Sequence, residues 1–167
     1  MNPVETERLV IAEASLEDAA FIIALLNSPI WIEFIGDRGI KSEQDARDYI
    51  QNSLINSYEE NGYGLYKVSL KEDEIPIGIC GILKRDYLDH VDLGFATLPE
   101  HESMGYTFEA SRAILEQSKS TLSLHPIYAI TSQQNSISQG LLIKLGFLDI
   151  GKIKPDGGEE ELMLFSN

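Results

Sequence analysis

The sequence predicts one α/β domain in which helices cover a mixed sheet. Its 167 residues are a usual length for one domain, and 43% of them are hydrophobic, which is enough to build a substantial core. Short strand-like runs alternate with longer segments of helical periodicity along the chain. Because no repeat, low-complexity tract or linker interrupts this series, we expect residues 1–167 to form a single domain.

The N-terminal part predicts a short strand followed by a helix. Residues 9–12 are an apolar run that suits an edge strand. Residues 15–18 read Ser-Leu-Glu-Asp, which resembles the capping box that opens a helix. Apolar side chains then recur at helical spacing to about Asn27, so one face of this helix is expected to pack against a sheet. Ser28-Pro29 ends the helix.

The connection at residues 30–41 is aromatic and punctuated by glycines. We expect it to form one wall of a substrate pocket, although Trp31 and Phe34 suit ordinary core packing equally well. A second helix is expected to begin at Ser42 and to continue to about Tyr58.

From Gly64 onwards the pattern changes to strands. Residues 65–70 and 77–83 flank an acidic turn and predict an antiparallel hairpin, to which residues 91–98 add a third strand. A helix is expected from Tyr106 to about Ser118. The remaining segments predict in order a strand, a helix and two strands, at residues 127–131, 136–145, 148–153 and 162–165.

Charge and cysteine content argue against several function classes. The formal net charge of −14 disfavours nucleic-acid or anionic-membrane partners, because phosphate groups attract clustered Lys and Arg. Cys80 is the only cysteine, so no intrachain disulfide forms, and its apolar strand suits a core residue better than a nucleophile. The histidines lack metal-ligand spacing, so we expect no metal. Without a basic leader or a long apolar run, the chain is expected to be cytoplasmic.

The most informative segment joins the strand at residues 91–98 to the helix that begins at Tyr106. The loop from Glu102 to Gly105 ends at a helix N-terminus, where converging backbone N–H groups can hold a pyrophosphate without a basic side chain. A second cluster, Asn135-Ser136-Ile137-Ser138, opens the next helix and is followed by Leu145-Gly146-Phe147. Together the two clusters predict a cofactor-binding transferase.

The order of the elements and both clusters resemble the GNAT superfamily of acetyl-coenzyme A-dependent N-acetyltransferases, most closely its RimJ/RimL-like branch. The resemblance extends from Thr6-Glu7-Arg8-Leu9 to Leu145-Gly146-Phe147 and the terminal strand. It implies a central, mixed, mostly antiparallel twisted sheet of about seven strands with helices on both faces. It also implies acetyl transfer, without a metal, to a primary amine of a small molecule or a protein N-terminus. A homodimer is compatible with the sequence.

In that family the pantetheine arm of the cofactor lies between two diverging strands, and the loop binds the pyrophosphate. By resemblance, the cofactor-binding residues are Phe95, Ala96, Thr97, Ser103, Met104, Gly105, Tyr106, Thr107, Asn135 and Ser138. The simpler interpretations are sheet packing for the strand residues and a helix N-cap for Asn135. Glu109 in the first turn is explained by its favourable interaction with the helix dipole.

The chemistry of amine acetylation needs a proton acceptor, because an amine with a pKa of about 10 is mostly protonated at neutral pH. By resemblance Asp92 is the candidate general base, and Glu33 in the expected pocket wall is a second candidate. Many relatives have a Tyr that assists the departing thiolate, but Leu142 stands at that position here. The resemblance to the RimL-type pattern implies Ser138 as the substitute, with its hydroxyl donating a hydrogen bond to the thiolate.

Two departures from the family pattern keep a rival function class open. Glu102 places a carboxylate where the family favours Arg or Gln, and Leu142 lacks the usual hydroxyl. Both fit a non-catalytic acyl-coenzyme A-binding or regulatory protein of the same fold. An interaction domain without a cofactor site would leave Gly105 and the Asn135 cluster unexplained.

Overall fold

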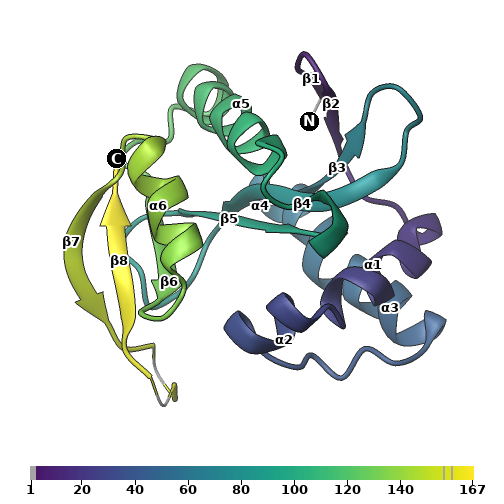
Figure 1. Ribbon diagram of the computed structural model, residues 1–167, viewed down its shortest axis with the longest axis horizontal. Helices are drawn as coiled ribbons and strands as arrows, with labels where there is room; N and C mark the ends of the chain where they lie inside the picture. The colour runs from purple at the N-terminus through teal and green to yellow at the C-terminus, as the bar shows by residue number, and fades with distance from the viewer. Residues whose placement is uncertain (1–2, 156, 159) are drawn as a thin grey trace.

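A computed structural model describes residues 3–155, 157–158 and 160–167. Its strands form one eight-stranded sheet in the order β1-β2-β3-β4-β5-β6-β8-β7 (Figure 1). Neighbouring strands run antiparallel except β5 and β6, which are parallel. Helices α1, α2 and α3 gather on one side of this sheet, and α5 and α6 lie on the other. The expected mixed, mostly antiparallel sheet with helices on both faces is confirmed.

The strand pattern agrees closely with the sequence prediction. The strands are β1 (Val4–Glu5), β2 (Leu9–Ala12), β3 (Leu65–Leu70), β4 (Pro76–Leu83), β5 (Asp92–Thr97), β6 (Tyr128–Ser132), β7 (Leu148–Ile153) and β8 (Leu162–Ser166). Only β1 is unpredicted, because two residues are too few for an alternating pattern to be recognised.

The helices follow the predicted start signals. The α-helices are α1 (Ala19–Leu26), α2 (Pro29–Phe34), α3 (Glu43–Tyr49), α4 (Asn56–Asn61), α5 (Tyr106–Thr121) and α6 (Ser136–Lys144). Ser15 and Ser42 both form the capping boxes that their sequences predict. Ser15 opens the short 3₁₀-helix η1 (Leu16–Asp18), which continues into α1, and the π-helix η2 (Ile50–Ile55) joins α3 to α4.

Helix α2 lies in a segment that the sequence predicts to be a connection rather than a helix. The hydroxyl of Ser28 accepts a hydrogen bond from the Trp31 backbone N–H at 3.4 Å, and Pro29 occupies the first helical turn. The same dipeptide that ends α1 therefore also starts α2. Trp31 is only 5% exposed and belongs to the core, so its packing interpretation is correct.

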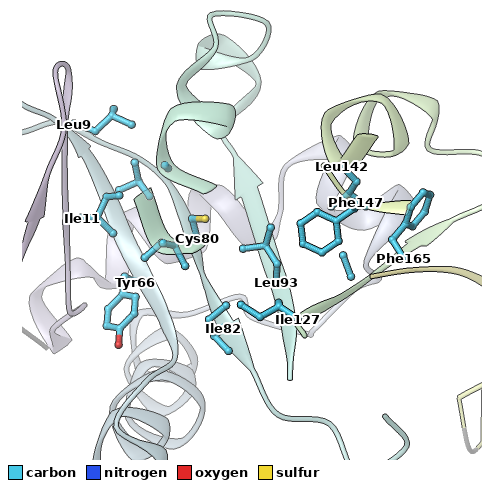
Figure 2. Close-up of a cluster of buried hydrophobic side chains, with 14 of the residues drawn as sticks. Leu9, Ile11, Tyr66, Cys80, Ile82, Leu93, Ile127, Leu142, Phe147 and Phe165 are labelled. Atoms are coloured by element: carbon cyan, nitrogen blue, oxygen red, sulfur yellow. The ribbon is translucent and has the colours of Figure 1, made fainter. Parts of the chain in front are cut away.

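Two hydrophobic cores lie on opposite faces of the sheet. One lies between the sheet and helices α5 and α6 and includes Leu93, Leu142 and Phe165 (Figure 2). The other packs α1 and α3 against the sheet around Ile22 and Ile79. Cys80 is buried in the first core, and burial raises the pKa of its thiol to about 12, so it is inert at neutral pH.

Candidate active site

Strands β5 and β6 separate soon after they begin. Among the described residues, their ladder pairs only Asp92 with Tyr128, and the Tyr128 N–H donates a hydrogen bond to the Val91 carbonyl at 2.8 Å. On its other side β5 pairs with β4 along its whole length. In the described part of the chain, the backbone groups of residues 93–97 that face away from β4 therefore have no strand partner. Such an edge can accept an extended ligand in the manner of an added strand.

The open end of β5 leads through the 3₁₀-helix η3 (Pro99–His101) into the N-terminus of α5. Ser103 and Gly105 have left-handed backbones, with φ of 61° and 81°, so the loop turns sharply before the helix. Gly105 occupies the N-cap position, and no side chain in the described part of the chain caps the helix. The first N–H groups of α5 are thus left for a ligand, and the helix dipole adds partial positive charge there. This geometry suits a phosphate group.

Two further features define this loop. The hydroxyls of Thr97 and Thr107 are hydrogen-bonded at 2.8 Å, which ties the end of β5 to the first turn of α5. Glu102 at the start of the loop is partly buried, and this desolvation raises the pKa of its carboxyl group. The loop therefore carries a carboxyl group where the family pattern has a cation or an amide.

The Asn135 cluster lies beyond the C-terminal end of β6, where β5 and β6 are apart. The side-chain oxygen of Asn135 accepts a hydrogen bond from the Ser138 backbone N–H at 3.0 Å, so its N-cap interpretation is confirmed. Within the described residues the Nδ2 group of Asn135 has no acceptor and can donate to a ligand. Ser138 is half-buried in the first turn of α6.

Asp92 lies at the joined end of the two strands. Its side chain is 1% exposed, and the Arg85 Nε lies 3.1 Å and 3.0 Å from its two carboxyl oxygens. Burial raises the pKa of Asp92, and the adjacent guanidinium opposes this rise. No hydrogen bond or ion pair joins Asp92 to Ser138 among the described residues. Asp92 pairs with Tyr128 at the start of β6, whereas Ser138 lies in α6 beyond its end, so the two candidate catalytic residues lie near opposite ends of β6.

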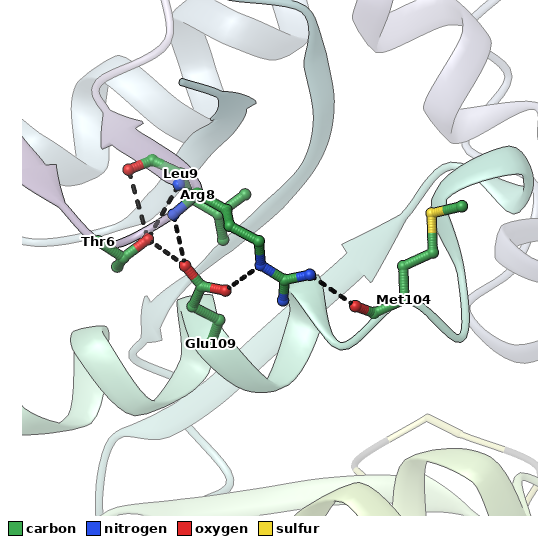
Figure 3. Close-up of polar contacts among 5 residues, drawn as sticks. All are labelled: Thr6, Arg8, Leu9, Met104 and Glu109. Carbon is green, nitrogen blue, oxygen red and sulfur yellow. Dashed lines mark hydrogen bonds and ion pairs between the residues drawn. The ribbon is translucent and has the colours of Figure 1, made fainter. Parts of the chain in front are cut away.

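A polar network between segments far apart in the sequence anchors the loop before α5 (Figure 3). Glu109 accepts hydrogen bonds from the Thr6 hydroxyl at 2.6 Å, the Arg8 backbone N–H at 2.9 Å and Arg8 Nε at 2.7 Å. Arg8 Nη1 donates to the Met104 carbonyl at 3.0 Å. The partners Arg8 and Glu109 are 101 residues apart, so no local pattern could have joined them.

The other candidates are placed as follows. Glu33 is exposed on α2. Leu142 is 1% exposed and points into the core shown in Figure 2, so the position that carries Tyr in many relatives is apolar here. Across the described ranges, no three His, Cys, Asp or Glu side chains are grouped as metal ligands. None of the described helices has the length and apolar character needed to cross a bilayer.

Comparison with known proteins identifies the family of this chain. The family model of the acetyltransferase (GNAT) domain matches residues 8–148. Uncharacterized N-acetyltransferase YoaA of Bacillus subtilis is 26% identical over 157 residues, which cover 92% of this chain and 88% of YoaA.

Solved structures share the fold over the whole chain. An acetyltransferase from Agrobacterium tumefaciens superimposes with a TM-score of 0.84 at 22% identity, covering 100% of this chain and 94% of that one. RimL, a ribosomal L7/L12 alpha-N-protein acetyltransferase in complex with coenzyme A, gives a TM-score of 0.85 at 12% identity, with 99% and 97% covered. The fold is that of these acetyltransferases, and with residues 8–148 matching the domain model, the chain belongs to the GNAT acetyltransferase family.

Proposed function

We propose that this chain transfers the acetyl group of acetyl-coenzyme A to a primary amine. The observation that carries the proposal is that the unpaired edge of β5 leads directly into the uncapped N-terminus of α5. The edge offers backbone partners to the amide groups of the pantetheine arm, and the helix end offers N–H groups to the pyrophosphate.

The cofactor contacts follow from this arrangement. In our proposal the pantetheine arm lies along residues 95–97 and is contacted from the other side by Asn135 Nδ2 and by Ser138. The pyrophosphate lies against the backbone of residues 103–107. These contacts use backbone and amide groups, which explains how an acidic chain of net charge −14 would hold an anionic cofactor.

The reaction is a direct transfer without an acyl-enzyme. The amine nitrogen attacks the thioester carbonyl carbon, a C–N bond forms, and the C–S bond breaks as the thiolate leaves. Asp92, directly or through water, takes the proton that the amine loses. The Ser138 hydroxyl donates a hydrogen bond to the thiolate, which takes its proton from solvent. Positioning of the two bound reactants supplies much of the rate enhancement.

For the acceptor we propose a protein N-terminal amine or a small-molecule amine, as in the RimJ/RimL-like branch. RimL, which shares the fold, is a ribosomal L7/L12 alpha-N-protein acetyltransferase. The net charge of −14 favours an acceptor that is cationic at neutral pH. A cytoplasmic location and a homodimer complete the proposal.

Calorimetric titration of the purified protein with acetyl-coenzyme A and with coenzyme A tests the proposal. Saturable binding with one site per chain is expected, followed by thiol release when a panel of amines is added. Binding without thiol release from any amine would favour the rival, a non-catalytic acyl-coenzyme A-binding protein, which Glu102 and the buried Leu142 support. Absence of binding at millimolar ligand would contradict both.

A further inference from the structure

Thr6, Arg8 and Glu109 form a clamp between the N-terminal segment and the first turn of α5, here called the N-terminal clamp (Figure 3). Glu109 is 16% exposed and accepts three hydrogen bonds, two of them from Arg8. The Arg8 guanidinium also stacks over the Tyr106 ring, with its central carbon 4.4 Å from the ring centroid. Glu109 and Tyr106 therefore hold the Arg8 side chain in place, although it is 42% exposed.

The remaining contact of Arg8 fixes the orientation of one peptide group. Arg8 Nη1 donates to the carbonyl oxygen of Met104, which belongs to the same peptide unit as the Gly105 N–H. In a trans peptide the C=O and the following N–H point in opposite directions. With the Met104 carbonyl held toward Arg8, the Gly105 N–H points to the other side of the loop.

We propose that Arg8 is a positioning residue that aims the Gly105 N–H at the pyrophosphate of coenzyme A, and that Glu109 and Thr6 hold Arg8 in place. The inference rests on the proposed function, because it needs coenzyme A to bind at this loop. It gives the Arg8–Glu109 ion pair a role beyond stability, since the Arg8 side chain is 42% exposed and solvent weakens its attraction to Glu109. It also explains why Arg suits this position: its Nε and Nη1 bind two acceptors at once, which one ammonium group does less well.

The loop has a particular need for such support. Gly105 adopts φ of 81° and no side chain caps the helix, so the peptide unit before it lacks a local constraint. Glu102, on the same loop, brings a carboxyl group rather than the family's Arg or Gln. A correctly aimed N–H at Gly105 therefore replaces part of the attraction that a basic side chain would supply.

The test combines calorimetry with amide NMR of wild type, Arg8→Ala, Arg8→Lys and Glu109→Gln, each titrated with coenzyme A. We expect affinity to fall about tenfold in Arg8→Ala, the effect of one charge-assisted hydrogen bond, and by less in Arg8→Lys. The Gly105 amide resonance should shift on titration of wild type and shift much less in Arg8→Ala. Arg47→Ala is the matched control, because Arg47 is 39% exposed and pairs with Glu43 on α3.

The outcomes separate the two proposals. Absence of coenzyme A binding by wild type would contradict the proposed function itself. Binding by wild type together with unchanged affinity and an unchanged Gly105 shift in Arg8→Ala would overturn the positioning role alone. If Arg8→Ala does not fold, Arg8→Lys and Glu109→Gln decide the question, because both keep side chains of similar size. Wild-type affinity in both of these variants would also overturn it.

Discussion

Asp92 is a single carboxyl group on which burial and ion pairing act in opposite directions. Its 1% exposure favours the neutral form, whereas Arg85 favours the charged form. Both of its oxygens lie within hydrogen-bond distance of the same guanidinium nitrogen. A role as general base therefore requires the amine, or a water molecule, to compete with Arg85. A purely structural role at the joined end of β5 and β6 requires no such competition.

Substitution of Asp92 by Asn separates these roles. Asp92→Asn removes the counter-charge of the partly buried Arg85, so we expect a loss of about 2 kcal/mol in unfolding free energy. Coenzyme A affinity should stay within about twofold, while turnover falls strongly if Asp92 is the base. Chemical denaturation and initial-rate assays measure these effects.

Arg85→Gln is the control for this experiment, because it breaks the same ion pair but keeps the Asp92 carboxyl group. Equal activity of both variants would remove Asp92 as the base.

Glu109 gives a pH-dependent contribution to stability. Its partial burial acts to raise the pKa, but the hydrogen bonds from Thr6 and Arg8 outweigh burial and lower the pKa below the usual 4.5. The folded state therefore binds this proton less tightly than the unfolded state. The stabilisation is fully present above the unfolded pKa and is lost as the pH falls through the folded pKa. Thermal unfolding between pH 6 and about pH 3 should thus show a smaller decrease in Glu109→Gln than in wild type. Parallel decreases in the two proteins would show that the clamp is not coupled to this proton.

At the scale of elements, Gly81 in β4 lies against the backbone at the start of β3 and leaves no room for a side chain. A Cβ placed on Gly81 would lie 1.9 Å from the carbonyl oxygen of Gly64, which accepts a hydrogen bond from the Ile82 N–H at 3.1 Å. The obstructing atom is backbone, so it cannot move aside as a side chain can. The run Ile77-Gly78-Ile79-Cys80-Gly81 is easily recognised as a strand from its sequence. The sequence does not show that the close approach to Gly64 requires a glycine at position 81.

Two glycine-to-alanine variants should therefore change stability with opposite signs. Gly81→Ala pushes apart paired backbones, and we expect it to destabilise by at least about 2 kcal/mol. Gly140→Ala, within α6, meets nothing within 4 Å and should stabilise by about 0.5–1 kcal/mol through helix propensity. Denaturant titrations of both variants decide the matter. A tolerated Gly81→Ala would mean that β3 and β4 separate more easily than their packing indicates.

Two variants of Asn135, at the start of α6, test whether this residue does more than cap the helix. Asn135→Ala removes the acceptor for the Ser138 N–H and should cost about 1 kcal/mol of stability. Asn135→Ser keeps a capping oxygen but loses the Nδ2 donor. If Asn135 also contacts the cofactor, calorimetry should show weakened coenzyme A binding in both variants, whereas only Asn135→Ala is clearly destabilised. Wild-type affinity in Asn135→Ser would restrict Asn135 to its capping role.

At the scale of the whole molecule, the sheet brings distant segments to one end of the site. Because β5 and β6 are parallel and diverge, the loop before α5 and the start of α6 both lie beyond the C-terminal ends of these strands. The N-terminal segment then reaches the same loop through Arg8. A net charge of −14 makes such local convergence necessary, since the overall field opposes an anionic cofactor.

Much of this architecture could be predicted because its signals are local. Seven of the eight strands in the described residues, and most of their helices, are predicted from such signals. These signals are the capping residues at Ser15 and Ser42, the alternating apolar runs and the spacing of the two clusters. The prediction misses β1, which is too short, and α2, because Ser28-Pro29 reads as a helix end while also being a helix start.

The sequence by itself determined the order of the elements, the GNAT resemblance and the loop that ends at Gly105, because each depends on residues that are neighbours in the chain. Only the tertiary structure decided that Arg85 neutralises a buried Asp92, that Leu142 is core, and that Glu109 binds Arg8. These contacts depend on burial and on which side chains the folded sheet brings together. Neither is encoded at any fixed spacing along the chain, so local patterns do not reveal them.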